Sequence, residues 1–186
     1  MFVCMSPKFV YVSNTKSGSS SVYKFLEQNY TVQMRFNRPF KKIPPAFIDY
    51  PSFTVVRHPY PRLTSWWWSA VYNVKDDRYG HQRELAKMKL DTRFSHFLKL
   101  WKTKKQTRQV VVLEENKQGI DYVVKLENID EEMSNLPFFK SENIKLTNLN
   151  HRPDRPKWED VLSENDIKEI NKIYHEDFIA FGYEKA

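Results

Sequence analysis

The chain has 186 residues, of which 40% are hydrophobic and 15% aromatic, enough to bury one substantial core but too few for two ordinary domains. Its formal net charge of +7 and pI near 9.3 indicate a surface that attracts anions, either phosphorylated or sulfated ligands or nucleic acid. The single cysteine, Cys4, excludes an internal disulfide, and no apolar stretch approaches the roughly 20 residues that span a bilayer. We expect one domain over residues 1–186, a buried Cys4 thiol, and a soluble, cytoplasmic protein without a membrane span.

The first predicted elements are a strand and a helix with a polar loop between them. Residues 8–13 (KFVYVS) are β-branched and aromatic, and residues 19–28 carry apolar side chains at helical spacing. The alternating segment 30–36 (YTVQMRF) predicts a second strand. A proline-rich connection then leads to residues 53–57 (FTVVR), an apolar run typical of a buried parallel strand. The prolines of HPYPRLTSWWWSAVYN (58–73) suit the first turn of a following helix.

The second half of the chain continues this alternation. Residues 94–101 (FSHFLKLW) place aromatic and leucine side chains on one helical face. Residues 120–129 (IDYVVKLENI) predict another buried strand, followed by a short helix through Met133 and Leu136. A basic loop, residues 147–158 (TNLNHRPDRPKW), precedes a closing helix with Ser163 as its cap. Strands that alternate with helices predict an α/β fold, a three-layer α/β/α domain with a mostly parallel central sheet.

The first loop, residues 13–21 (SNTKSGSSS), has the composition of a phosphate cradle. A loop between a strand and a helix exposes backbone N–H groups at the positive end of the helix dipole. Gly18 allows a close backbone approach, Lys16 supplies a point charge, and the surrounding serines supply hydroxyl donors. The alternative is a serine-rich N-cap with Lys16 in solvent. Because Lys16 precedes the glycine, the loop lacks the Walker A pattern, which disfavours an ordinary ATP or GTP enzyme.

A second anion site is predicted after the buried strand at 53–57. In VVRHPYPRLTSWW (55–67), Arg57 ends the strand and Ser65 lies about two turns into the next helix. Ligands of open α/β sheets bind at the carboxyl ends of the strands, where the first loop is also expected. Two separated anion sites at one edge indicate a ligand with two phosphate groups.

These two motifs resemble those of the sulfotransferases that use 3′-phosphoadenosine 5′-phosphosulfate (PAPS). TKSGSSS (15–21) resembles the family's 5′-phosphosulfate loop, and VVRHPYPRLTSWW (55–67) resembles its 3′-phosphate motif. A weaker similarity covers VVKLENIDEEM (123–133) and IYHEDFIAFGYEK (173–185), which are similar to the closing segments of carbohydrate-type and bacterial members. The matches follow the family's order along nearly the whole chain. They imply a single sulfotransferase domain with a P-loop-NTPase-like fold.

The resemblance implies that sulfate moves from PAPS to a hydroxyl acceptor, leaving adenosine 3′,5′-bisphosphate (PAP), with no metal and no nucleic-acid partner. A carbohydrate is favoured as acceptor over a tyrosine or a small molecule. Lys16 would contact the oxygen that bridges sulfate and phosphate, which makes it the catalytic residue. The residues implied in nucleotide binding are Lys16, Ser17, Gly18, Ser19, Ser20, Ser21, Arg57, Ser65 and Arg152.

Several positions depart from the family pattern or stay open. Ser21 stands where cytosolic members carry an adenine-stacking aromatic, and His58 stands where Asp or Asn is usual, which we interpret as turn chemistry. In the basic loop, Arg155 and Lys157 are alternatives to Arg152, or are surface charges. The three tryptophans at 66–68 are expected to face the core rather than a sugar.

The general base is not assigned from sequence, because the family's usual segment offers only an aspartate, and a solvated surface position is favoured for the three other candidates. The four candidates are Asp49, His81, Glu84 and His96. Two other function classes stay open. A kinase with an unusual phosphate loop predicts magnesium-dependent ATP binding, and a basic nucleic-acid-binding module predicts oligonucleotide affinity that falls steeply with salt.

Overall fold

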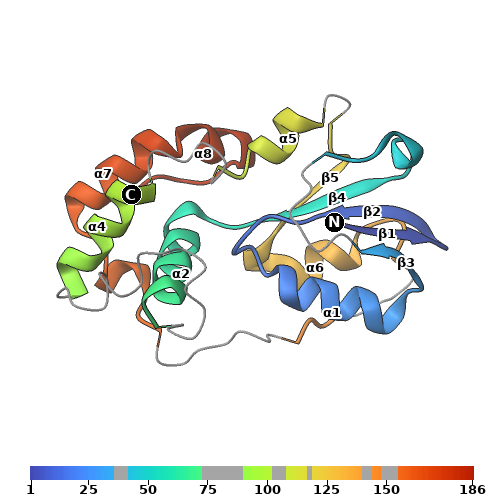
Figure 1. The fold of residues 1–186 in the computed structure, drawn as a ribbon, viewed down its shortest axis with the longest axis horizontal. Helices are drawn as coiled ribbons and strands as arrows, with labels where there is room; N and C mark the ends of the chain where they lie inside the picture. The colour runs from blue at the N-terminus through green and yellow to red at the C-terminus, as the bar shows by residue number, and fades with distance from the viewer. Residues whose placement is uncertain (36–41, 73–89, 102–107, 117–118, 140–143, 148–154) are drawn as a thin grey trace. The chain divides into compact units, whose positions relative to one another are not determined.

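The computed structural model describes residues 1–35, 42–72, 90–101, 108–116, 119–139, 144–147 and 155–186 (Figure 1). Contacts within the chain gather in two compact units. Unit 1 comprises Met1–Arg57 and Gln109–His151, and unit 2 comprises His58–Arg108 and Arg152–Ala186. The chain therefore leaves unit 1 after Arg57 and returns to it at Gln109. The single domain over residues 1–186 stays a prediction.

A five-stranded sheet with the order β3-β1-β2-β4-β5 organises unit 1. Strands β2, β4 and β5 pair in parallel, whereas β1 pairs antiparallel with both β2 and β3. The mostly parallel sheet expected from sequence is thus found on the β2-β4-β5 side only. The strands are β1 (Phe2–Met5), β2 (Lys8–Val12), β3 (Val32–Arg35), β4 (Ser52–Val56) and β5 (Tyr122–Lys125).

Strand β1 corrects the sequence-based prediction, which had no strand before residue 8. Only residues 6 and 7 separate β1 from β2. So short a connection permits an antiparallel hairpin, because a parallel pair needs a crossover of a dozen or more residues. Strand β5 is also shorter than the predicted 120–129, since Leu126–Asn128 form a 3-10 turn. The mixed α/β class is confirmed.

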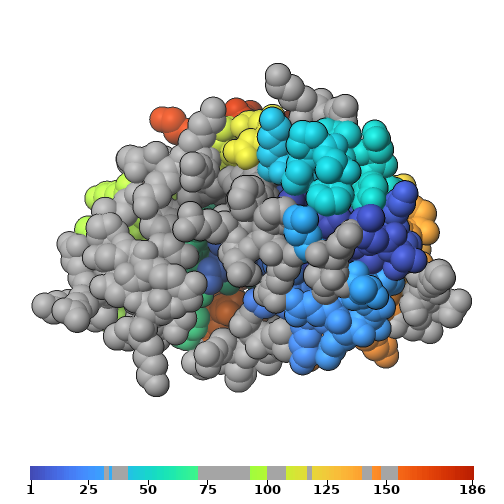
Figure 2. All heavy atoms as spheres, turned by 45° about the vertical axis from the view of Figure 1, so that its right-hand side comes forward, coloured from blue at the N-terminus to red at the C-terminus, as the bar shows by residue number. Residues whose placement is uncertain are grey.

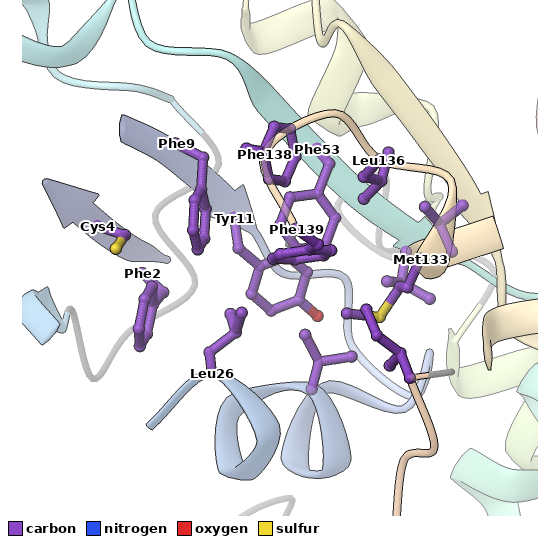
Figure 3. Close-up of a cluster of buried hydrophobic side chains, with 14 residues drawn as sticks. Phe2, Cys4, Phe9, Tyr11, Leu26, Phe53, Met133, Leu136, Phe138 and Phe139 are labelled. Atoms are coloured by element: carbon purple, nitrogen blue, oxygen red, sulfur yellow. The ribbon is translucent and has the colours of Figure 1, made fainter. Parts of the chain in front are cut away.

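One face of the sheet packs against helices α1 (Ser19–Asn29) and α6 (Ile129–Ser134). Aromatic rings dominate this core, and Phe9 stacks on Phe138 with ring centroids 4.9 Å apart. Figure 3 shows Phe9, Tyr11 and Phe53 directed from the strands toward α1, with Phe138 and Phe139 packed among them. Cys4 lies fully buried in the same cluster, as expected.

The opposite face of the sheet carries a smaller core. Successive residues of a strand point to opposite faces. Accordingly, Val10 and Val12 lie in this second core with Val112 of α5 (Val111–Glu115), whereas their neighbours in β2 belong to the first core. Figure 2 shows the outside of unit 1, where the segment around the 3-10 turn Pro45–Phe47 lies above the N-terminal hairpin and α1 lies below it.

Unit 2 is helical in its described residues. The predicted helix after Arg57 is α2 (Pro59–Tyr72), and the apolar face predicted around residues 94–101 belongs to α4 (Leu90–Trp101). Trp67 is fully buried and Trp66 is nearly so, which confirms that the tryptophan run faces the core. The predicted closing helix is two helices, α7 (Glu164–Ile173) and α8 (His175–Phe181).

Candidate functional site

The loop between β2 and α1 is built on two residues with left-handed backbone. Gly18 has φ 74° and Lys16 has φ 66°. Glycine adopts this conformation without steric cost, whereas a lysine there is strained by about 1–2 kcal/mol. Backbone strain of this kind is concentrated at functional sites. The loop therefore holds Lys16, a half-buried residue, in a conformation that its own preference opposes.

The first helical turn after this loop has the geometry of an anion site. Gly18 is the N-cap of α1 and makes no side-chain capping bond, and no acidic residue lies in the first turn of this fully described helix. The first backbone N–H groups of a helix lack intrahelical partners and carry the positive end of the helix dipole. The serine cap of the alternative considered from sequence is not found, because the cap position belongs to a glycine, and anion binding by this turn stays a prediction.

Two of the loop serines direct their hydroxyls into the protein. Ser17 is fully buried, and its Oγ donates to Gln109 Oε1 over 2.9 Å. Ser19 Oγ donates to the backbone oxygen of Asn14 over 2.6 Å. A hydroxyl has one proton to donate, so neither side chain donates to an anion in this arrangement. The backbone N–H groups are what these two residues offer to a ligand, while Ser20 is exposed and Ser21 is half-buried.

Arg57 lies at the same edge of the sheet as the loop. Strands β2 and β4 are parallel neighbours, so the residues that follow Val12 and Val56 emerge at one edge. The backbone of Arg57 is bonded twice to Gln109. Its N–H donates to Gln109 Oε1 over 2.8 Å, and its carbonyl accepts from Gln109 Nε2 over 2.7 Å. The structure thus joins the Lys16 loop and Arg57 through a single buried amide.

Asn14, at the beginning of the loop, is hydrogen-bonded to strand β4, which ends just before Arg57. Its side chain is 4% exposed and donates to Thr54 Oγ1 over 3.1 Å and to the Val55 carbonyl over 3.4 Å. Thr54 Oγ1 in turn donates to the Val12 carbonyl over 2.7 Å. Sequence reasoning missed both Asn14 and Gln109. An asparagine two residues after a strand was a usable signal, whereas Gln109 is 92 residues from Ser17 and carried none.

Ser65 and the basic loop belong to unit 2. Ser65 lies in α2, is 6% exposed, and its Oγ accepts a hydrogen bond from Arg155 Nη1 over 3.3 Å. Arg155 was an alternative to Arg152 in the sequence analysis. Arg152 itself lies outside the described residues. The arrangement of Ser65 relative to the Lys16 loop stays a prediction.

His58 has structural partners within unit 2. Its Nε2 lies 3.1 Å from the Glu184 carbonyl oxygen, and the Tyr60 N–H donates to its Nδ1 over 3.4 Å. A neutral imidazole with its proton on Nε2 satisfies both contacts. The ring also packs edge-on against Phe178, with centroids 5.6 Å apart. These contacts favour the predicted turn role of His58 over a catalytic one.

The four candidates for the general base differ in where they lie in the structure. Asp49 is exposed and precedes β4, so it lies at the amino end of that strand, opposite the edge that carries Arg57. His96 is a half-buried residue of α4 in unit 2. His81 and Glu84 lie outside the described residues. Asp49 is therefore unsuited to act beside Lys16.

Neither a metal cluster nor a membrane-spanning helix is found in the described part of the chain. Among these residues, no group of three or more His, Cys, Asp and Glu side chains is arranged to hold a metal ion. Within the same ranges, no helix combines the length and apolar character required to cross a membrane.

Comparison with known protein families identifies the family of the chain. The model of a family described as "Sulfotransferase family" matches residues 1–184, nearly the whole chain. Neither the curated proteins nor the solved structures include a significant match. The matched range contains every residue of the site described above.

Proposed function

The chain belongs to the sulfotransferase family, whose members transfer a sulfuryl group, and we propose that it uses PAPS as donor and a carbohydrate hydroxyl as acceptor. The observation that carries the proposal is the bridge from Ser17 through Gln109 to Arg57. It supports a ligand with an anionic group at each end, because it holds two anion-binding segments at one sheet edge.

The loop of residues 15–21 is suited to the 5′ end of the donor. Gly18 supports this role, because its φ of 74° favours glycine and a Cβ atom at that position would stand 2.6 Å from Leu126 Cδ1, so that Leu126 would have to move to admit a larger residue. The N–H groups of the loop and of the first turn of α1 would bind the 5′-phosphate. We assign this function to Ser17, Gly18, Ser19, Ser20 and Ser21.

We assign binding of the 3′-phosphate to Arg57, Ser65 and Arg152. Arginine suits this role because its guanidinium presents several donors in the geometry of a phosphate. The contact between Arg155 and Ser65 supports Arg155 as a further contributor. In this proposal the spacing of the two phosphates selects the nucleotide.

Lys16 is the residue that would act on the reacting atoms. The donor supplies a phosphosulfate whose S–O bond breaks as the acceptor oxygen attacks sulfur in line; PAP leaves with the bridging oxygen, and the acceptor hydroxyl gives its proton to the general base. The Lys16 ammonium would stabilise the negative charge that develops on the bridging oxygen, and the loop would hold that oxygen in position. The transfer resembles phosphoryl transfer, in which positioning and charge stabilisation contribute more than covalent help.

A thermal-shift measurement with PAP tests the donor. A ligand that binds the native state raises the melting temperature by mass action. We expect PAP to raise the melting temperature without magnesium, and we expect this shift to be lost in Lys16→Ala and in Arg57→Ala. The control is Lys42→Ala, which changes an exposed lysine of the same unit and should keep the shift. Absence of a shift in the parent protein would overturn the assignment of PAPS.

Related binding measurements distinguish this function from the two alternatives. A magnesium-dependent shift with ATP, without one for PAP, would indicate a kinase. Oligonucleotide affinity that falls steeply with salt and survives Lys16→Ala would indicate a nucleic-acid-binding module.

Transfer of labelled sulfate from PAPS to a panel of sugars, tyrosine peptides and small phenols then tests the acceptor, and we expect labelling of sugars.

A further inference from the structure

Gln109 is a buried amide whose side-chain hydrogen bonds lead to the candidate site. Its side chain is fully buried. Its Oε1 accepts from Ser17 Oγ over 2.9 Å and from the Arg57 N–H over 2.8 Å. Its Nε2 donates to the Arg57 carbonyl over 2.7 Å. Buried polar groups of this kind are costly unless they are satisfied, and they rigidify the structure when they are.

The geometry of these bonds fixes one segment against the other. The planar amide holds both backbone polar groups of Arg57, so it sets the orientation of that residue as well as its position. The same oxygen holds Ser17, which is adjacent to Lys16. A shift of either segment would break at least one bond to the shared oxygen. The two segments are therefore coupled through the Gln109 side chain.

We propose that Gln109 is a positioning residue that sets the spacing between the 5′-phosphate loop and Arg57, so that one nucleotide reaches both. This inference rests on the proposed function. Gln109 would not touch the ligand. Its effect is to make the second phosphate of a bisphosphate bind with little further rearrangement, because Arg57 is already placed. It thereby determines how strongly the protein distinguishes PAP from a nucleotide that lacks the 3′-phosphate.

The informative substitution is Gln109→Met, which keeps an unbranched side chain of similar volume and removes these three hydrogen bonds. Gln109→Glu is a second variant, because a carboxylate still accepts from Ser17 and Arg57 N–H but cannot donate to the Arg57 carbonyl. The matched control is Asn116→Leu. Asn116 is another buried amide of unit 1, with Oδ1 accepting from the Ile43 N–H and Nδ2 donating to the Val112 carbonyl, away from the candidate site.

The measurement is calorimetric titration of each protein with PAP and with adenosine 5′-monophosphate, well below the melting temperature. The quantity compared is the ratio of the two dissociation constants, which isolates the contribution of the 3′-phosphate. We expect Gln109→Met to reduce this ratio about tenfold or more, and Gln109→Glu to reduce it by a smaller factor, because a carboxylate keeps both bonds to the shared oxygen and loses only the bond to the Arg57 carbonyl. Asn116→Leu should leave the ratio unchanged, even if its melting temperature falls as far as that of Gln109→Met.

The outcomes distinguish this inference from the function on which it rests. If the parent protein does not bind PAP, the proposed function fails. If the parent binds PAP and discriminates against the monophosphate, but Gln109→Met discriminates equally well, the positioning role is wrong and Gln109 serves stability only. An equal fall of the ratio in Asn116→Leu would likewise overturn the inference, since it would show a general effect of lost buried bonds. If Gln109→Met does not fold, the same comparison is made with Gln109→Glu and the same outcomes apply.

Discussion

Leu126, just after β5, closes over Gly18 so tightly that a Cβ atom at position 18 would stand 2.6 Å from Leu126 Cδ1. Gly18 also has φ 74°, in the left-handed region that favours glycine. The loop that carries Lys16 is thus shaped both by its own backbone and by the end of a strand more than 100 residues away in sequence.

Gly18→Ala should destabilise the protein for both reasons. We expect a fall of about 2 kcal/mol in the free energy of unfolding, measured by urea denaturation. Gly119→Ala is the matched control, since Gly119 has φ 86° but nothing beyond its chain neighbours lies within 4 Å of where a Cβ atom would stand. That variant should lose only about 1 kcal/mol, the backbone cost. Equal losses at the two positions would show that the Leu126 contact is without effect, and Leu126→Ala should remove the difference between them.

Lys16→Asn should separate stability from activity. Asparagine tolerates the left-handed backbone better than lysine, so the variant should retain or slightly raise the melting temperature. Loss of the ammonium group should lower sulfuryl transfer by about a hundredfold or more. Both quantities are measured on one preparation, by thermal unfolding and by transfer from labelled PAPS. Retention of activity would contradict the catalytic role, and a marked loss of stability would contradict the strained-loop interpretation.

Arg155→Ala should weaken the binding of PAP, because Arg155 donates to Ser65, which the proposed function places at the 3′-phosphate. We expect an increase of about tenfold in the dissociation constant, the usual size for a lost charge-assisted bond. Lys157→Ala is the control, since Lys157 is exposed and lies two residues further along. Measuring Arg152→Ala beside them decides which arginine of this loop contributes more. A change in Lys157→Ala as large as in Arg155→Ala would indicate only a general effect of charge.

Ser163→Ala should destabilise helix α7. Ser163 and Asp166 form a capping box, in which Ser163 Oγ accepts from the Asp166 N–H over 3.2 Å and Asp166 Oδ2 accepts from the Ser163 N–H over 3.0 Å. Loss of such a cap costs about 1 kcal/mol. Asn165→Ala, at an exposed position of the same turn, should change stability by less than about 0.5 kcal/mol. Both are measured by urea denaturation, and a Ser163→Ala variant as stable as the parent would contradict the prediction.

Cys4 should react slowly with thiol reagents. Burial raises the pKa of the Cys4 thiol, more than nearby backbone hydrogen bonds lower it. A raised pKa leaves less thiolate at a given pH, and the thiolate is the reactive form. At about pH 8 the native protein should therefore react with a chromogenic disulfide about a hundredfold more slowly than the protein unfolded in urea. Similar rates in the two states would show that the N-terminal strand opens readily.

The features that could be predicted from sequence were local ones. The serine and acid of the capping box stand three residues apart, and both of its bonds are formed. Helices α1, α2 and α4 followed from apolar spacing and from the prolines at the start of α2. Strand β1 was missed because a short apolar run has no period of its own. Its status as a strand depends on pairing with β2 and β3. The break between α7 and α8 at Tyr174 was also missed, since neither Gly nor Pro stands there.

The sequence by itself determined the chemistry of this protein: a lysine, a glycine and serines between a strand and a helix, and an arginine at the end of a buried strand. Spacing and composition suffice for that, because loops and helix ends are specified by neighbouring residues. Only the tertiary structure decided which groups these residues offer to a ligand, since the Ser17 hydroxyl donates inward to Gln109 and Gln109 also holds Arg57. Those partners are 92 and 52 residues apart in the chain, so they meet only when the sheet and its connections have folded.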